Sequence, residues 1–170
     1  MNESFQCSML GRWTDIIDKR NRFMEKSIVL GYVHMSSYRK NGRLYPDYFK
    51  EEESGLKEIN DNSPDEVILP PDEEYTLIID YPLNIPFMTK LESGEKGMTR
   101  RQVVEFVIGC YKRIYKEEDG TTKVKAGLIP GMVNRNETNG KYGIWGHGIS
   151  DLILHTLYVD GNKLSISCDS

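Results

Sequence analysis

The stretch MTRRQVVEFVIGCYKRIYKEED, residues 98–119, decides the fold that we expect, because it is the clearest helical pattern in the chain. Its apolar residues recur every three or four positions and therefore share one helical face. They are Val103, Phe106, Val107, Cys110, Tyr111 and Ile114. Thr99 suits an N-cap, and Gln102 completes a capping box three residues later. Gly120 marks the expected end, so the pattern predicts a helix over about residues 99–118.

Runs rich in β-branched and aromatic residues lie on both sides of this segment and predict an antiparallel sheet. Residues 75–83, YTLIIDYPL, indicate a strand buried on both faces, which turns through a proline into an antiparallel partner at 87–93. Residues 27–35 are typical of another strand. Two runs around the turn DGN at 160–162 predict a β-hairpin over about 152–168.

The N-terminal stretch RWTDIIDKRNRFMEK carries five apolar residues at helical spacing and predicts a helix over about residues 12–26. Asn41-Gly42 indicates a short hairpin turn downstream of it. We therefore expect an α+β fold: an antiparallel sheet with the long helix and the N-terminal helix packed on it, ending in the β-hairpin. A chain of 170 residues is expected to form a single domain over residues 1–170.

The net charge of −4 hides an uneven distribution along the chain. Residues 51–74 hold ten acidic side chains and one lysine, whereas the rest of the chain is net positive. The segment also contains three prolines, which favours a solvated acidic loop or mobile insert at 51–74 over a packed element. The alternative is a docking strip for a basic partner.

Several classes of protein are disfavoured by what the sequence lacks. No apolar run is long enough to cross a bilayer, and the N-terminus lacks the pattern of a secretory signal. We therefore expect a cytoplasmic or nuclear protein without membrane association. Neither phosphate-binding glycine loop nor a zinc-ligand spacing is present, so we expect no cofactor and no metal. The net negative charge makes nucleic acid an unlikely partner.

The stretch KYGIWGHGISDLILH, residues 141–155, is the strongest candidate for a functional site. His147 can act as a general acid or base, and Asp151 four residues later could orient its imidazole. Trp145 offers a flat apolar wall between glycines that permit close approach of other groups. Upstream, Asn134 and Arg135 supply donors, and the fork of Arg135 matches a small anionic ligand.

The same residues also suit a purely structural corner, which the sequence favours. Trp145 would then fill the core, His147 would bond a backbone carbonyl, and Asp151 would cap a turn. His155 lies in a strand run and is expected to be a core residue with its hydrogen bonds satisfied. We therefore expect a non-enzymatic interaction or structural module with a protein partner. The alternative is a small hydrolase or transferase in which His147 is the base, Asp151 the orienting group and Arg135 the anion clamp.

Two resemblances accompany these expectations. YTLIIDYPLNIPF followed by a helix resembles the ubiquitin-conjugating and RWD superfamily, which implies a binding variant without activity. Neither Cys110, inside the helix, nor Cys168, near the end of the chain, stands where that family places its conjugating cysteine. The combination of DYPL, GMTRRQ and YGIWGH followed by DLIL resembles small uncharacterised proteins of large DNA viruses and microbial eukaryotes. This second resemblance implies no function.

Overall fold

The computed structural model describes residues 26–35, 38–40, 43–45, 63–131 and 135–170. The helix expected at about 12–26 lies outside these residues, apart from Lys26, which begins the first strand. The expected turn at 41–42, the candidate Asn134 and most of the acidic segment also lie outside them.

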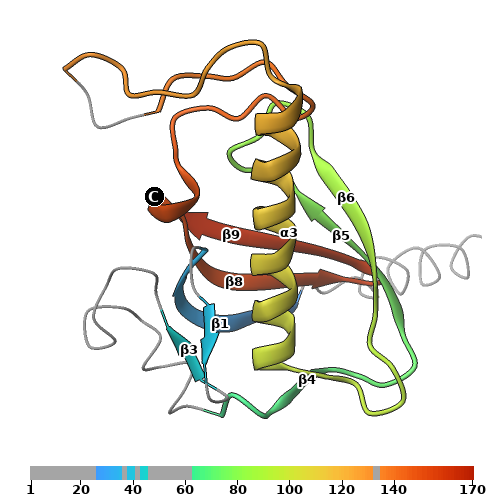
Figure 1. Ribbon diagram of the computed structural model, residues 1–170. Helices are drawn as coiled ribbons and strands as arrows, with labels where there is room; N and C mark the ends of the chain where they lie inside the picture. The colour runs from blue at the N-terminus through green and yellow to red at the C-terminus, as the bar shows by residue number, and fades with distance from the viewer. Residues whose placement is uncertain (1–25, 36–37, 41–42, 46–62, 132–134) are drawn as a thin grey trace, which may run out of the picture.

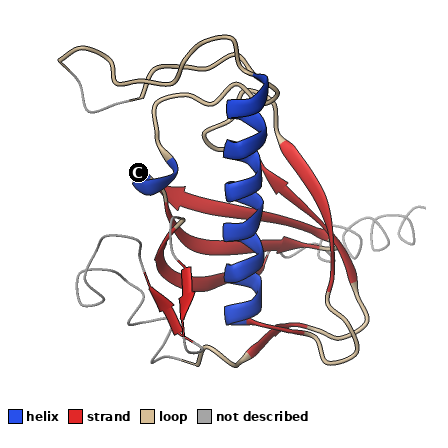
Figure 2. Cartoon of the chain, viewed as in Figure 1, coloured by secondary structure: helices blue, strands red, loops and turns tan. Residues whose placement is uncertain are grey.

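One sheet and one long helix form the body of the described chain, which confirms the α+β class (Figure 1). The sheet has five strands in the order β1-β8-β9-β5-β6. Their bounds are β1 Lys26–His34, β5 Glu74–Ile79, β6 Phe87–Glu92, β8 Ile153–Asp160 and β9 Lys163–Asp169. The helix α3, Arg100–Thr121, lies across one face of this sheet (Figures 1 and 2).

Short elements complete the described chain. Two small antiparallel ladders pair β2 with β3 and β4 with β7, and a single turn of 3₁₀ helix, η2, precedes β8. Their bounds are β2 Tyr38–Lys40, β3 Arg43–Tyr45, β4 Val67–Leu69, β7 Met98–Thr99 and η2 Ile149–Asp151. The β2–β3 ladder pairs Lys40 with Arg43.

The two expected hairpins are confirmed, but the sheet is not purely antiparallel. β5 pairs with β6, and β8 with β9, in the antiparallel sense. The pairing of β5 with β9 is parallel, with Leu77 opposite Leu164. This arises because the C-terminal hairpin lies between β1 and β5, so that β9 borders a strand far away in sequence.

The helix begins as expected and ends later than expected. The Thr99 hydroxyl accepts from the Gln102 backbone N–H at 3.3 Å, and the Gln102 side chain accepts from the Thr99 N–H at 2.8 Å. Gly120 does not end the helix, which runs on to Thr121. The helix ends before Thr122. The N–H of this residue still donates to the Glu118 carbonyl at 2.8 Å, but its backbone is extended.

Strand β5 is buried on one face rather than on both. Leu77 and Ile79 point toward α3 and are almost fully buried, whereas Ile78 between them is half-buried. Ile78 pairs with Met88, which is 66% exposed, on the face that α3 does not cover. The prediction that both faces of β5 are buried is therefore wrong, because in the described part of the chain a helix covers only one face of the sheet.

The described end of the acidic segment contacts the start of α3, although most of its side chains are exposed. Residues 63–74 include β4, which pairs with β7 at the start of α3. Glu66 forms an ion pair with Arg100 at 2.6 Å, and Asp65 lies 3.5 Å from Arg101. Positive charge is unfavourable in the first turn of a helix. These two carboxylates compensate it, so this end of the segment is an intramolecular partner of the helix.

Candidate functional site

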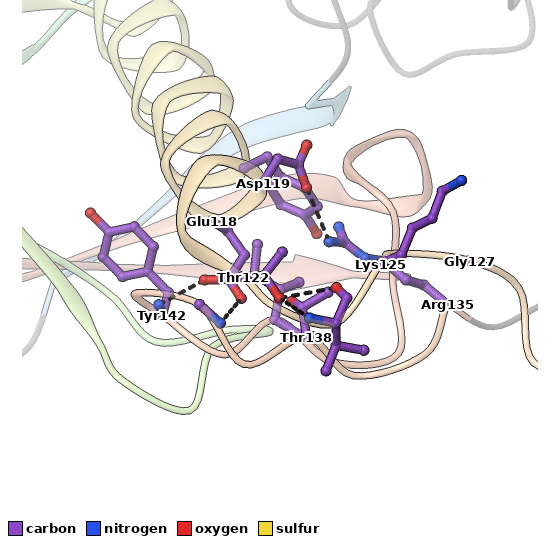
Figure 3. A network of polar contacts seen from close by, with 12 residues as sticks. Glu118, Asp119, Thr122, Lys125, Gly127, Arg135, Thr138 and Tyr142 are labelled. Atoms are coloured by element: carbon purple, nitrogen blue, oxygen red, sulfur yellow. Dashed lines mark hydrogen bonds and ion pairs between the residues drawn. The ribbon is translucent and has the colours of Figure 1, made fainter.

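The loop from residue 135 to 148 lies at the C-terminal end of α3 and is fastened there by one buried carboxylate (Figures 1 and 3). Glu118, in the last turns of the helix, is fully buried. Its side chain accepts the backbone N–H groups of Gly140 at 2.7 Å, Tyr142 at 2.8 Å and Gly143 at 3.2 Å. A side chain at position 140 would collide with this carboxylate, since a Cβ there would lie 2.7 Å from its carbon.

The charge of Glu118 is stabilised by these donors. Burial by itself would raise the pKa of its carboxyl group, but hydrogen bonds oppose this effect. They come from the Tyr142 N–H, the Thr138 hydroxyl and the N–H groups of the two glycines, and together they lower the pKa below its usual value. Glu118 therefore holds the loop as a carboxylate, in charge-assisted hydrogen bonds.

The same loop is held on its other side by the turn after β5. The Asn84 and Ile85 N–H groups donate to the Tyr142 carbonyl at 3.0 and 2.9 Å, and the Trp145 N–H donates to the Pro82 carbonyl at 3.1 Å. Ile144 is fully buried and fills the core beneath the loop, whereas Trp145 is 38% exposed. The expectation that Trp145 fills the core is therefore wrong. Its neighbour occupies that place, and Trp145 is displayed at the surface.

Two other aromatic side chains lie beside this exposed tryptophan. We call Tyr81, Trp145 and His147 the aromatic cluster. The ring centroids lie 5.3 Å apart for Tyr81 and Trp145, 5.7 Å for Tyr81 and His147, and 6.0 Å for Trp145 and His147. The Ser170 hydroxyl lies 2.8 Å from the Tyr81 hydroxyl and 3.3 Å from the His147 Nε2. These spacings are those of contacting aromatic pairs, so the rings support one another.

The structure does not bring His147 and Asp151 together as a catalytic pair. Among the described residues, the side chain of His147 contacts Ser170 and the aromatic cluster, and its backbone carbonyl accepts from the Tyr115 hydroxyl at 2.9 Å. Asp151 accepts the Gly148 N–H at 2.7 Å and the Ser150 hydroxyl at 3.2 Å. Asp151 thus caps η2, which is the structural role considered for it from the sequence.

The side chain of Arg135 contacts other residues than His147. Its backbone stands opposite Gly146, which has a positive φ of 72°, in an isolated antiparallel bridge. The Arg135 guanidinium stacks over the Tyr115 ring at 5.2 Å and lies 3.5 Å from the Asp119 carboxylate (Figure 3).

A cavity of about 450 Å³ opens beside Arg135. Its lining residues come from the end of α3, the segment after it and the turn before β8. They are Asp119, Ala126, Gly127, Leu128, Arg135, Gly148, Ser150 and Asp151. Arg135 and Asp151 thus share this cavity, as the sequence suggested, but His147 and Trp145 are not among its lining residues.

His155 lies on the face of the sheet that α3 leaves uncovered, not in the core. Its ring nitrogens lie 2.8 Å from the Thr156 hydroxyl and 3.2 Å from the Ser167 hydroxyl, and Asp169 is 3.4 Å away. The ladder between β8 and β9 shifts its register at this residue. Such a bulge changes which face the following side chains take. His155 and Leu157 are two positions apart and would share a face in a regular strand, but here they do not.

The residue that organises the loop, Glu118, was missed in the sequence. It sits in the run KEEDG, which looks like a solvated helix end. Glu118 nevertheless lies four positions after Ile114 and seven after Tyr111, so it continues the apolar stripe of α3. A charged residue in register with a buried stripe was the signal that could have found it.

No group of three or more His, Cys, Asp or Glu side chains that could hold a metal ion occurs in the described ranges. No helix there is long and apolar enough to span a membrane. The chain matches no protein-family model, no curated protein and no solved structure at a significant level. The two family resemblances therefore stay predictions, and the function has to be argued from the site itself.

Proposed function

We propose that this chain is a non-enzymatic interaction module that binds a protein partner through the aromatic cluster. The observation that carries the proposal is Trp145, a large aromatic side chain that is 38% exposed on a fastened loop. Tryptophan and tyrosine are enriched among the residues that dominate protein interfaces, because they bury large apolar area and keep one polar group.

The rigidity of the loop supports binding. Glu118 fastens the loop from the helix side, and the Pro82 carbonyl holds the Trp145 backbone from the other. A partner that covers Trp145 would therefore meet a surface that is already ordered, so little conformational entropy is lost on binding. The location that we propose for the complex is the cytoplasm or nucleus, as expected from the sequence.

The geometry favours binding over the enzymatic alternative. A general base needs an orienting partner, and the carboxylate considered for that role, Asp151, is engaged by Gly148 and Ser150. The anion clamp considered for the reaction, Arg135, lines a cavity whose walls do not include His147. The acidic segment, the second contact surface considered, is engaged at its described end by Arg100 and Arg101. The proposal therefore centres on the aromatic cluster.

Photo-crosslinking tests the proposal. Benzoylphenylalanine is placed at position 145 in the full chain and, as a matched control, at Met88, which is exposed on the uncovered face of the sheet. Both proteins are irradiated in extracts of cells that express the chain. We expect a discrete protein adduct from position 145 that excess wild-type chain competes away, and none with this behaviour from position 88.

The competitor variants decide the outcome. Trp145→Ala is expected to compete at least about tenfold less well than the wild-type chain, because interface tryptophans contribute 2 kcal/mol or more. Met88→Ala should compete as well as the wild type. If Trp145→Ala, shown to be folded by circular dichroism, competes within about threefold of the wild type, the proposed surface is wrong. Hydrolysis of acyl or phosphoryl test substrates that is lost in His147→Ala would instead support the enzymatic alternative.

A further inference from the structure

The cavity beside Arg135 has the size and the chemistry of a small-molecule site. Its volume of about 450 Å³ lies within the range of known ligand pockets, roughly 300–1,000 Å³. It is separate from the aromatic cluster, because none of the three cluster residues lines it. What it binds can be argued from the groups that line it.

Arg135 has hydrogen-bonding capacity that the described residues do not use. Its side chain is only 11% exposed, and its Nε is buried without a hydrogen-bond partner among the described residues, so a ligand is left the two Nη groups. One of these lies 3.5 Å from Asp119, which is long for a hydrogen-bonded ion pair and is the one ion pair of Arg135 with the described residues. A guanidinium has five donors arranged to grip a carboxylate in two parallel hydrogen bonds. A ligand carboxylate would therefore gain more from Arg135 than Asp119 does.

The other charged groups of the cavity exclude a simple anion. Asp119 and Asp151 also line it, so its charged side chains sum to −1. Phosphate or sulfate next to Arg135 would be repelled by both carboxylates. A ligand that also carries a positive group can bond to them, because a carboxylate offers about four acceptor positions and the described residues give Asp151 only two donors.

The spacing of the charges narrows the class of ligand further. Asp119 and Arg135 are immediate neighbours, so the ligand needs a positive and a negative group only a few bonds apart. The ammonium and carboxylate groups of an α-amino acid share one carbon atom and meet this requirement. The apolar part of the lining is supplied by Ala126 and by Leu128, which is 73% exposed and lacks an apolar cover in the described chain.

We infer that this cavity binds a free α-amino acid with an apolar side chain. Arg135 takes the carboxylate, Asp119 and Asp151 take the ammonium group, and Leu128 and Ala126 contact the side chain. Binding replaces one long, partly exposed ion pair, which contributes little, by ion pairs between the ligand and three charged side chains. This inference does not rest on the protein-binding role of the aromatic cluster, since the two sites share no residue.

Calorimetric titration of the full chain with three probes tests the inference. The probes are L-leucine, 4-methylpentanoate, which keeps the carboxylate and side chain, and 3-methylbutylamine, which keeps the ammonium group and side chain. We expect L-leucine to bind with a Kd of about 1 mM or below, and each half-ligand to bind at least about tenfold more weakly. No leucine binding at about 10 mM, or 4-methylpentanoate binding as tightly as leucine, overturns the inference.

Variants separate the two charge interactions. Asp119→Asn alters a side chain that is 63% exposed, so it should fold normally. It is expected to weaken L-leucine binding at least about fivefold while leaving 4-methylpentanoate binding unchanged or tighter. Arg135→Gln should abolish binding of both L-leucine and 4-methylpentanoate. The matched control is Arg113→Gln, because Arg113 is an exposed arginine that pairs with Glu117. Unchanged leucine binding in Asp119→Asn would refute the assignment, and Trp145→Ala should leave leucine binding intact.

Discussion

Glu118→Gln is the perturbation that most directly probes how the loop is held. The wild-type Oε2 accepts two backbone N–H groups, from Tyr142 and Gly143, and Oε1 accepts one, from Gly140. A glutamine oxygen can replace Oε2, but its NH₂ group then faces the Gly140 N–H, so that two donors oppose each other in a buried site. The substitution therefore changes hydrogen bonding with almost no change in volume.

The expected cost follows from these three hydrogen bonds. Leaving one buried N–H without an acceptor costs about 1–3 kcal/mol, and loss of the charge weakens the other two bonds by about 1 kcal/mol together. We therefore expect Glu118→Gln to lower the free energy of unfolding by about 3 kcal/mol. For a chain of this length that corresponds to a decrease in Tm of about 6–12 °C. Glu118→Ala, which removes all three acceptor contacts, should lose about 5 kcal/mol.

Urea unfolding followed by circular dichroism measures the loss, and Glu117→Gln is the matched control. Glu117 is the neighbouring carboxylate, paired at the surface with Arg113 and Lys141. It also accepts the Tyr142 hydroxyl at 2.6 Å, a contact that a glutamine oxygen can keep. Exposed ion pairs contribute about 0–1 kcal/mol, so the control should lose far less stability. Hydrogen exchange should also report faster exchange of the Tyr142 and Gly143 amides in Glu118→Gln than in Glu117→Gln.

The pH dependence supplies a second test. The pKa of Glu118 is lowered in the folded state, so its stabilising effect is present above the ordinary carboxyl pKa of 4.5. The effect is lost as the pH falls through the folded-state pKa. The difference in stability between wild type and Glu118→Gln should therefore shrink below pH 4.5. Equal stability of Glu118→Gln and Glu117→Gln at pH 7, or a difference that does not change in acid, would refute the reasoning.

Three further substitutions or treatments follow from the fold. Thr99→Ala removes the capping box of α3 and should cost about 1 kcal/mol in urea unfolding; no measurable loss would contradict the assigned cap. Gly97→Ala should lower the free energy of unfolding by about 3 kcal/mol, because φ is positive and a Cβ would lie 2.5 Å from a backbone oxygen. Gly94 also has a positive φ but faces open space, so Gly94→Ala should lower it by only about 1 kcal/mol. Equal losses of stability in the two variants would rule out the close contact at Gly97. Burial raises the pKa of Cys110 and of Cys168 to about 11. Both thiols should therefore react with iodoacetamide at pH 8 at least about 100-fold more slowly in the native protein than in urea, and comparable rates would show that they are not buried.

The elements with local signals were predictable from the sequence. The capping box of Thr99 and Gln102 and the spacing of apolar residues predict both ends of α3 to within a few residues. The DGN turn places the last hairpin correctly. The parallel contact between β5 and β9 was not predictable in this way. It joins Leu77 to Leu164, and no local pattern indicates which edge of a hairpin a distant strand will take.

The candidate site was located by its glycines, but the roles of its residues depend on pairing across the loop. The sequence shows Ile144 and Trp145 as adjacent apolar residues, and which of them is buried depends on the contacts that the backbone makes. Arg135 likewise contacts Tyr115 and Asp119 of α3 rather than His147. Neither outcome is visible in the local sequence, because both depend on contacts between residues far apart along the chain.

The place of the C-terminal hairpin in the sheet has a consequence for how the protein is made. β8 and β9 lie between β1 and the β5–β6 hairpin, yet they come after all the other described strands in the sequence. During translation β1 leaves the ribosome before its partner β8 has been made, and β5 leaves it before its partner β9. Unpaired strand edges of this kind promote aggregation. A premature stop codon before residue 153 would therefore leave the single strand β1 and the β5–β6 hairpin with no strand to join them, rather than a smaller version of the same sheet.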